Sequence, residues 1–209
     1  TLLASMTMIS CGTEVTKVDT FVEADDPVAL TSEETAAWDA VGNKLNASWS
    51  DADVHYRRTT VPAVDCGALQ KISAWKGERA SAQLLVWTAE AKSGVNCEIP
   101  DFVADGAVLP SSIAEARFVR YTLADEQKYK FKKGGPAVIA PDMLDTLSFY
   151  NMEARSVRPV WVSVYVPQDA ATGKYKATVT VSHDGFGKVK LPMELEVVDH
   201  VLPSPDKWS

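Results

Sequence analysis

The sequence predicts an all-β protein, an antiparallel β-sandwich with one amphipathic helix near its N-terminus. Three observations lead to this prediction. Short segments rich in β-branched and aromatic residues recur from residue 69 onward. Several of them alternate between apolar and polar side chains, and Gly, Asp or Pro separates one segment from the next. Helical periodicity stands out only before residue 56.

The helix is expected to begin after Thr31, because Thr31 and Glu34 form a capping-box signature. Apolar residues then recur at helical spacing: Trp38, Val41, Leu45 and Trp49. This stripe predicts a helix that ends near residues 48–51. Its two tryptophans have two interpretations, a platform that stacks on sugar rings or core residues that pack on a sheet, and we favour the core.

Six later segments are predicted to be strands: residues 69–75, 81–89, 115–123, 158–167, 175–182 and 188–198. The fourth segment alternates most clearly. Within residues 160–166, one face carries Val160, Val162, Val164 and Val166, and the other carries Trp161, Ser163 and Tyr165. One face of this strand is therefore expected to lie in the core of the sandwich.

Composition excludes several classes of protein. The chain has 209 residues and a net charge of −7, which argues against nucleic acid as a partner. No apolar run approaches the roughly 20 residues of a membrane-spanning helix. Three histidines without a Cys-x-x-Cys pair do not fit a zinc site. We expect neither a metal nor a cofactor.

Residues 1–11 are predicted to be the remnant of a bacterial lipoprotein signal. The segment TLLASMTMISCG is apolar, uncharged and rich in small residues. Its Met8-Ile9-Ser10-Cys11 resembles a lipobox, with Met8 where leucine is usual, and Cys11 would carry the lipid. The alternative is a buried strand with a chance cysteine. We expect an exported lipoprotein of the outer membrane or periplasm, with residues 12–30 as an acidic, solvated tether.

Cys66 and Cys97 are the two remaining cysteines. An oxidising compartment permits a disulfide between them, and closing a loop of about 30 residues would stabilise the fold by about 3 kcal/mol. Two buried free thiols are the alternative. The sequence leaves both open, because it does not set the distance between the two Cα atoms.

Several motifs together resemble a known module. They are Tyr56 with Val61-Pro62, Trp75-Lys76-Gly77-Glu78-Arg79 before SAQLLVW, Ala140-Pro141-Asp142-Met143-Leu144, RSVRPVWVSVYVPQDAATGKYKATVTV, and the closing VLPSPDKWS. Over residues 31–209 the chain is similar to the N-terminal β-sandwich of glycoside hydrolase family 123. These are bacterial enzymes that release β-linked N-acetylgalactosamine. The block VPQDAATGKYKATVTV is the most distinctive part of the resemblance.

The resemblance implies that a catalytic (β/α)8 barrel follows the sandwich. Residues 31–202 are then an accessory domain, and residues 203–209, with their two prolines, are a linker to the barrel. The barrel and the glycan substrate are the expected partners. The alternative is a stand-alone carbohydrate-binding or adhesion module, since sandwiches host many functions.

The family is understood to use an adjacent Asp-Glu pair on the barrel, which orients an N-acetyl group of the substrate. Here the adjacent pair is Asp125-Glu126, which follows no barrel strand and has lysines nearby that would hold both carboxylates ionised. A general acid needs the protonated form, so we expect this segment to be catalytically silent and to have no catalytic residue.

The segment after that pair interleaves cations with aromatics: Lys128, Tyr129, Lys130 and Phe131, before Lys132 and Lys133. It would suit contact with an acidic or sulfated glycan, or with the neighbouring barrel. The alternative is a solvated hairpin, which is the commoner meaning of a run of lysines.

Overall fold

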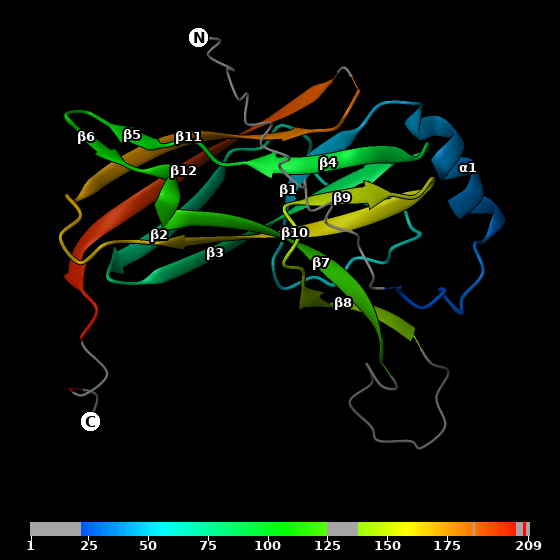
Figure 1. Ribbon diagram of the computed structural model, residues 1–209, viewed down its shortest axis with the longest axis horizontal. Coiled ribbons are helices and arrows are strands. Elements are labelled where there is room, and N and C mark those ends of the chain that lie inside the picture. The colour runs from blue at the N-terminus through cyan, green and yellow to red at the C-terminus, as the bar shows by residue number, and fades with distance from the viewer. Residues whose placement is uncertain (1–21, 125–137, 186, 204–206, 208–209) are drawn as a thin grey trace, which may run out of the picture.

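The computed structural model describes residues 22–124, 138–185, 187–203 and 207, and it shows two facing β-sheets with one helix beside them (Figure 1). This confirms the predicted all-β sandwich. The five-stranded sheet contains, in spatial order, β1 (Asn46–Ser50), β3 (Arg79–Thr88), β10 (Ser156–Tyr165), β7 (Ala114–Ala124) and β8 (Val138–Leu144).

The second sheet has seven strands. Its main path is β2 (Gln70–Lys76), β12 (Lys188–Val201), β11 (Gly173–Ser182), β4 (Lys92–Glu98) and β9 (Phe149–Met152). A small hairpin of β5 (Phe102–Ala104) and β6 (Ala107–Leu109) joins this sheet where Val103 pairs with Lys176. A short 3-10 helix, η1 (Ser111–Ile113), leads from the hairpin into β7.

Alternation along β10 and β11 builds the core between the sheets. Three valines of β10 and the valine that follows the strand are fully buried, as the sequence predicted: Val160, Val162, Val164 and Val166. β11 contributes a second row of buried side chains: Tyr175, Ala177, Val179 and Val181. The Tyr175 hydroxyl donates a hydrogen bond to the Ala171 carbonyl (2.8 Å), so this ring lies in the core and also fixes the preceding turn.

One strand pair departs from the predicted antiparallel arrangement, because β2 and β12 run parallel. The cause is the turn between β2 and β3, which does not form a hairpin but passes from one sheet to the other. Gly77 takes the positive φ of 84° that this corner requires, and its N–H donates to the Val166 carbonyl (2.8 Å). Every other strand pair in the described residues is antiparallel.

The helix begins as predicted but ends earlier. In α1 (Ser32–Val41) the Thr31 hydroxyl accepts from the Glu34 N–H (3.2 Å), and the Glu34 carboxylate accepts from the Thr31 N–H (2.9 Å). Gly42, with φ of 73°, ends the helix. The predicted extension to residues 48–51 is wrong, because residues 46–50 form β1. Leu45 and Trp49 both pack in the core between the sheets, and their spacing of four residues fits a helix as well as one face of a strand.

Both tryptophans of that stripe are core residues. Trp38 is fully buried against Leu85, Trp87 and Val157 on the outer face of the five-stranded sheet, and its indole N–H donates to the Thr59 carbonyl (2.7 Å). Trp49 lies between the sheets, and its N–H donates to the Pro192 carbonyl (2.8 Å). The core interpretation is therefore confirmed. α1 covers only part of the outer face, the apolar half.

A charged layer closes the end of the sandwich where β10 begins. Arg158, with 3% of its surface exposed, donates to both carboxylate oxygens of Glu23 (2.5 and 2.9 Å), to the Val119 carbonyl (2.9 Å) and to the Tyr150 hydroxyl (2.5 Å). Its guanidinium also lies 4.2 Å from the centre of the Tyr150 ring. Arg58 forms a second ion pair with Glu23 (3.3 Å).

The contacts of the same segment contradict the prediction of a solvated tether for residues 22–30. Glu23 and Asp26 lie in residues 12–30, yet their side chains are almost fully buried in ion pairs with arginines of the sandwich. A solvated spacer would leave these carboxylates in water. The segment from residue 22 onward therefore belongs to the folded domain, and residues 1–21 lie outside the described part of the chain.

Candidate functional site

The half of the outer face that α1 leaves uncovered is polar and aromatic. We call it the open face, and it comprises Arg79, Ser81, Glu115, Arg117, Trp161, Ser163 and Tyr165. Strand register sets its rows. Ser163 of β10 pairs with Ser81 of β3 on one side and with Glu115 of β7 on the other. Tyr165 pairs with Arg79 in the next row, nearer the end where β12 leaves the sandwich.

A hollow of about 300 Å³ lies on the open face, and we call it the face pocket. Tyr165, half exposed, forms one wall, and η1 with Ser112 forms another. Ser163 lines the hollow although only 5% of its surface is exposed.

Charged side chains rim the face pocket. Glu115 forms ion pairs with Arg79 and with Arg117, the second at 2.9 Å. Glu78, next to Arg79 in the sequence, is occupied elsewhere, because its carboxylate accepts from the Trp75 N–H (2.7 Å). The rim thus presents two guanidinium groups that share one carboxylate, so it offers both hydrogen-bond donors and an acceptor.

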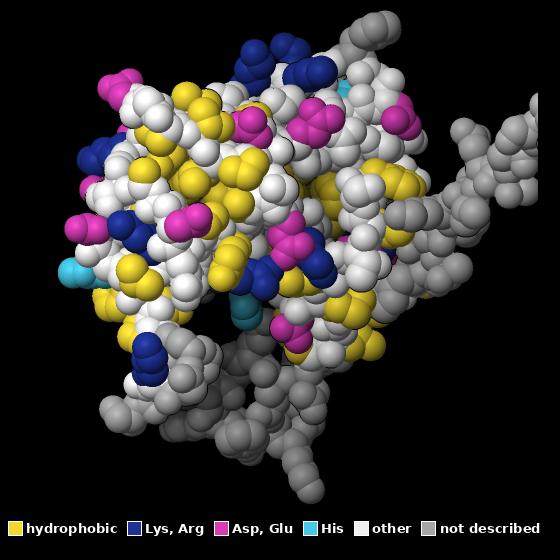
Figure 2. Space-filling view, turned by 60° about the vertical axis from the view of Figure 1, so that its left-hand side comes forward, with side chains coloured by type: hydrophobic (Ala, Val, Ile, Leu, Met, Phe, Trp, Pro, Cys, Tyr) yellow, Lys and Arg dark blue, Asp and Glu magenta, His cyan; other side chains and the backbone are white. Residues whose placement is uncertain are grey.

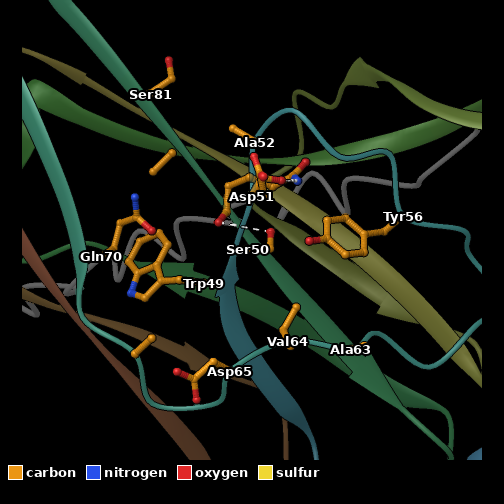
Figure 3. Close-up of a pocket in the computed structure, with 13 residues that line it drawn as sticks. Trp49, Ser50, Asp51, Ala52, Tyr56, Ala63, Val64, Asp65, Gln70 and Ser81 are labelled. Atoms are coloured by element: carbon orange, nitrogen blue, oxygen red, sulfur yellow. Dashed lines mark hydrogen bonds between the residues drawn. The ribbon is translucent and has the colours of Figure 1, made fainter.

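A second hollow, of about 460 Å³, lies beside the open face where β1 ends (Figure 3), and we call it the edge pocket. Trp49 and Gln70 line one side of it, and the Tyr56 ring lies on the other side and points toward Ser50 (Figure 3). Ser81 belongs to both this pocket and the open face. The two hollows are therefore neighbours across β3.

The edge pocket does not hold a pair of carboxylates arranged for hydrolysis. Its acidic side chains, Asp51 and Asp65, are both exposed. Asp51 accepts a hydrogen bond from the Asp53 N–H (2.9 Å) and so stabilises a local turn. Within the described residues no three His, Cys, Asp or Glu side chains gather as a metal site would require. The pocket offers aromatic surface and hydrogen-bonding groups.

Most of the site residues predicted from the sequence lie outside the described part of the chain. These are Cys11 and the segment with Lys128, Tyr129, Lys130 and Phe131. The Asp125-Glu126 pair, which we expect to be catalytically silent, also lies outside the described residues. Among the helices that the structure describes, none combines the length and apolar character needed to cross a bilayer.

The candidate disulfide is not formed, because Cys66 and Cys97 are both free. Cys66 lies exposed in the connection between β1 and β2, whereas Cys97 belongs to β4 and packs against the core. Burial raises the pKa of the Cys97 thiol to about 12. Of the two alternatives, the structure therefore has the free thiols, one of them exposed.

The two thiols are expected to differ in reactivity. In a Cys11→Ser variant at pH 8, a thiol reagent such as DTNB should titrate one group per native chain and two per chain in denaturant, because only the thiolate reacts and burial keeps Cys97 protonated. Absorbance of the released thiolate is the measurement. Zero groups in the native chain, with two appearing only after reduction, would mean that the bridge forms in solution.

The signal for the open face was present in the sequence only in part. Alternation along β10 placed Trp161, Ser163 and Tyr165 together, and the structure confirms that grouping. Arg79 and Glu115 come from other strands, so their place beside Ser163 depends on register, which no local pattern encodes.

The fold and the two hollows define a β-sandwich module with a hydroxyl- and aromatic-lined surface. Residues 49–183 match the glycoside hydrolase 123 N-terminal domain family. The chain belongs to this family. A comparison with curated protein sequences found no match.

One solved structure supports the fold. A family 123 glycoside hydrolase from Clostridium perfringens, studied for glycolipid glycan hydrolysis, is 21% identical with a TM-score of 0.72. The match covers 79% of this chain and 29% of that protein, so this chain spans less than a third of its length. The N-terminal domain of PorA is 10% identical with a TM-score of 0.38, over 75% of this chain and 99% of that domain.

Proposed function

We propose that this chain is the non-catalytic N-terminal accessory domain of an exported glycoside hydrolase that acts on glycans with β-linked N-acetylgalactosamine. In this proposal a (β/α)8 domain of the same protein carries the chemistry. The observation that carries the proposal is the family match combined with length, since this chain corresponds to only 29% of the related hydrolase. The edge pocket and the face pocket supply no paired carboxylates for hydrolysis.

Exposed apolar side chains support the presence of a neighbouring domain. Figure 2 shows hydrophobic side chains gathered on the end of the sandwich that carries the β5–β6 hairpin and the end of β12. Val103 and Val108 of the hairpin, Trp75 of β2 and Val201 of β12 are all exposed there. Contiguous apolar surface of this kind is typical of a contact face, and we assign it to the catalytic domain.

Export through a lipid on Cys11 is part of the same proposal. The lipobox-like sequence before Cys11 supports it. Expression of the gene with radiolabelled palmitate would test it, and a Cys11→Ser variant should lose the label and the membrane fraction together. Label that persists in the variant would rule out Cys11 as the acceptor.

The catalytic assignment has a direct test. This chain and the full-length gene product are compared at equal concentration for release of p-nitrophenol from p-nitrophenyl N-acetyl-β-galactosaminide. We expect turnover by the full-length protein only, because the described residues hold no acid–base pair. Turnover by the 209-residue chain would contradict the non-catalytic assignment. Absence of turnover by both would reject the proposed substrate and favour the second candidate below.

A stand-alone carbohydrate-binding module is the second candidate, and the open face is the observation that favours it. It predicts sugar affinity for this chain without any hydrolase activity in the full-length protein.

A further inference from the structure

We propose that the face pocket binds one neutral pyranose residue, a hexose or an N-acetylhexosamine, of a glycan chain that continues over the open face toward the edge pocket. This inference rests on the proposed function, because it makes the accessory domain a second contact with the hydrolase's glycan, separate from the catalytic domain. It assigns a ligand to a surface of this domain that catalysis does not use.

Size and wall chemistry fit a single sugar residue. The face pocket, at about 300 Å³, lies at the lower end of the roughly 300–1,000 Å³ typical of ligand pockets. The Tyr165 ring stands half exposed at its wall, where an aromatic face can stack on the C–H face of a pyranose. The apolar half of the same sheet face is already covered by α1, which leaves this half as the accessible one.

The Ser163 hydroxyl supplies a specific polar contact. Ser163 lines the hollow with 5% of its surface exposed. Its hydroxyl can both donate to and accept from a hydroxyl group of a bound sugar. Ser81, its neighbour in register, adds a second hydroxyl on the way to the edge pocket.

The lining of the face pocket favours a neutral ligand. Its charged residues are Arg79 and Glu115, which form an ion pair with each other, so the hollow itself offers donors and acceptors without a net charge. Arg117, which also pairs with Glu115, lies outside this lining. Paired guanidinium and carboxylate groups match the vicinal hydroxyls of a sugar, each of which donates and accepts. The sulfated or acidic glycan considered for residues 128–131 would instead require uncompensated cations.

A protein partner fits this surface less well. Charged residues are depleted from the core of protein interfaces, and the open face has three of them around its hollow. The apolar surface at the β5–β6 hairpin is the better candidate for contact between domains. The same protein thus has two different surfaces for two different kinds of partner.

The test is a titration of the ¹⁵N-labelled chain with methyl β-N-acetylgalactosaminide, methyl β-galactoside and their β-linked oligosaccharides up to about 10 mM, followed by amide shifts. We expect shifts at Ser81, Ser163 and Tyr165. Tyr165→Ala should weaken binding about tenfold and Ser163→Ala about threefold. Trp75→Ala removes an aromatic of similar exposure from the other sheet and should leave affinity unchanged.

Failure of this inference can be told from failure of the proposed function. The titration does not require hydrolysis, so it stands even if the full-length protein is inactive on the chromogenic substrate. In an active full-length enzyme, Tyr165→Ala should raise KM for an oligosaccharide and leave KM for the aryl glycoside unchanged. No shifts at the face pocket with any of these sugars, or equal loss with Trp75→Ala, would overturn the inference. So would protection of Tyr165 from hydroxyl-radical labelling in the sugar-free full-length protein, since another domain would then occupy the face.

Discussion

Replacement of Arg158 by methionine is expected to lower the free energy of unfolding by about 3–5 kcal/mol. The guanidinium satisfies both oxygens of Glu23 and also bonds the Val119 carbonyl and the Tyr150 hydroxyl. Its loss leaves the buried Glu23 carboxylate with only the Arg58 guanidinium (3.3 Å) and the Tyr121 N–H (3.1 Å) among the partners that the structure describes. A buried charge without adequate partners is far more costly than a lost surface contact.

Urea unfolding followed by tryptophan fluorescence measures this loss, and Arg117→Met is the matched control. Arg117 also lies in a strand and pairs with a glutamate, but both side chains are about two-fifths exposed, so its loss should be under about 1 kcal/mol. The double variant Arg158→Met, Glu23→Leu removes the stranded charge and should regain part of the stability. If the double variant is no more stable than Arg158→Met, the uncompensated carboxylate is not the cause.

Replacement of Trp38 by alanine should lower the free energy of unfolding by about 3–5 kcal/mol. Trp38 is fully buried between α1 and the apolar half of the five-stranded sheet, against Leu85, Trp87 and Val157. The change removes that packing and also strands the Thr59 carbonyl, which accepts from the indole N–H. α1 is only ten residues long, so it depends on this contact to stay folded.

Thermal and urea unfolding measure the effect of Trp38→Ala, and far-ultraviolet circular dichroism reports on α1. Trp38→Phe should cost less than the alanine variant, because most of the packing remains. Trp75→Ala is the control, since this exposed tryptophan should contribute under about 1 kcal/mol. A Trp38→Ala variant as stable as Trp75→Ala would show that α1 is not held to the sheet by this side chain.

The sequence predicted the long strands well, because burial of one face forces alternation. The predicted segments at 158–167, 175–182 and 188–198 overlap β10, β11 and β12 almost completely. β4 was missed because a glycine and an asparagine interrupt its apolar pattern, and among its side chains only Val95 is fully buried. β1 was missed because a spacing of four residues fits both a strand face and a helix.

The charged layer had no local signal at all. Arg158 and Glu23 are 135 residues apart in the chain, and the composition of neither segment indicates that these two side chains form an ion pair. An acidic segment before a helix is typical of a solvated tether, and only the fold brings Arg58 and Arg158 to it. The open face was predictable only in part. Alternation along β10 places Trp161, Ser163 and Tyr165 on one face, whereas the positions of Arg79 and Glu115 beside them depend on strand register.

The parallel pairing of β12 with β2 bears on how the protein is made. β12 is the last strand along the chain that the structure describes, yet it lies inside its sheet, between β2 and β11, and Met193 pairs with Gln70. A ribosome that adds about 5–20 residues per second exposes β2 several seconds before its partner exists. During that interval the nascent chain carries a strand edge open to aggregation, and the sandwich can close only in a late, non-local step.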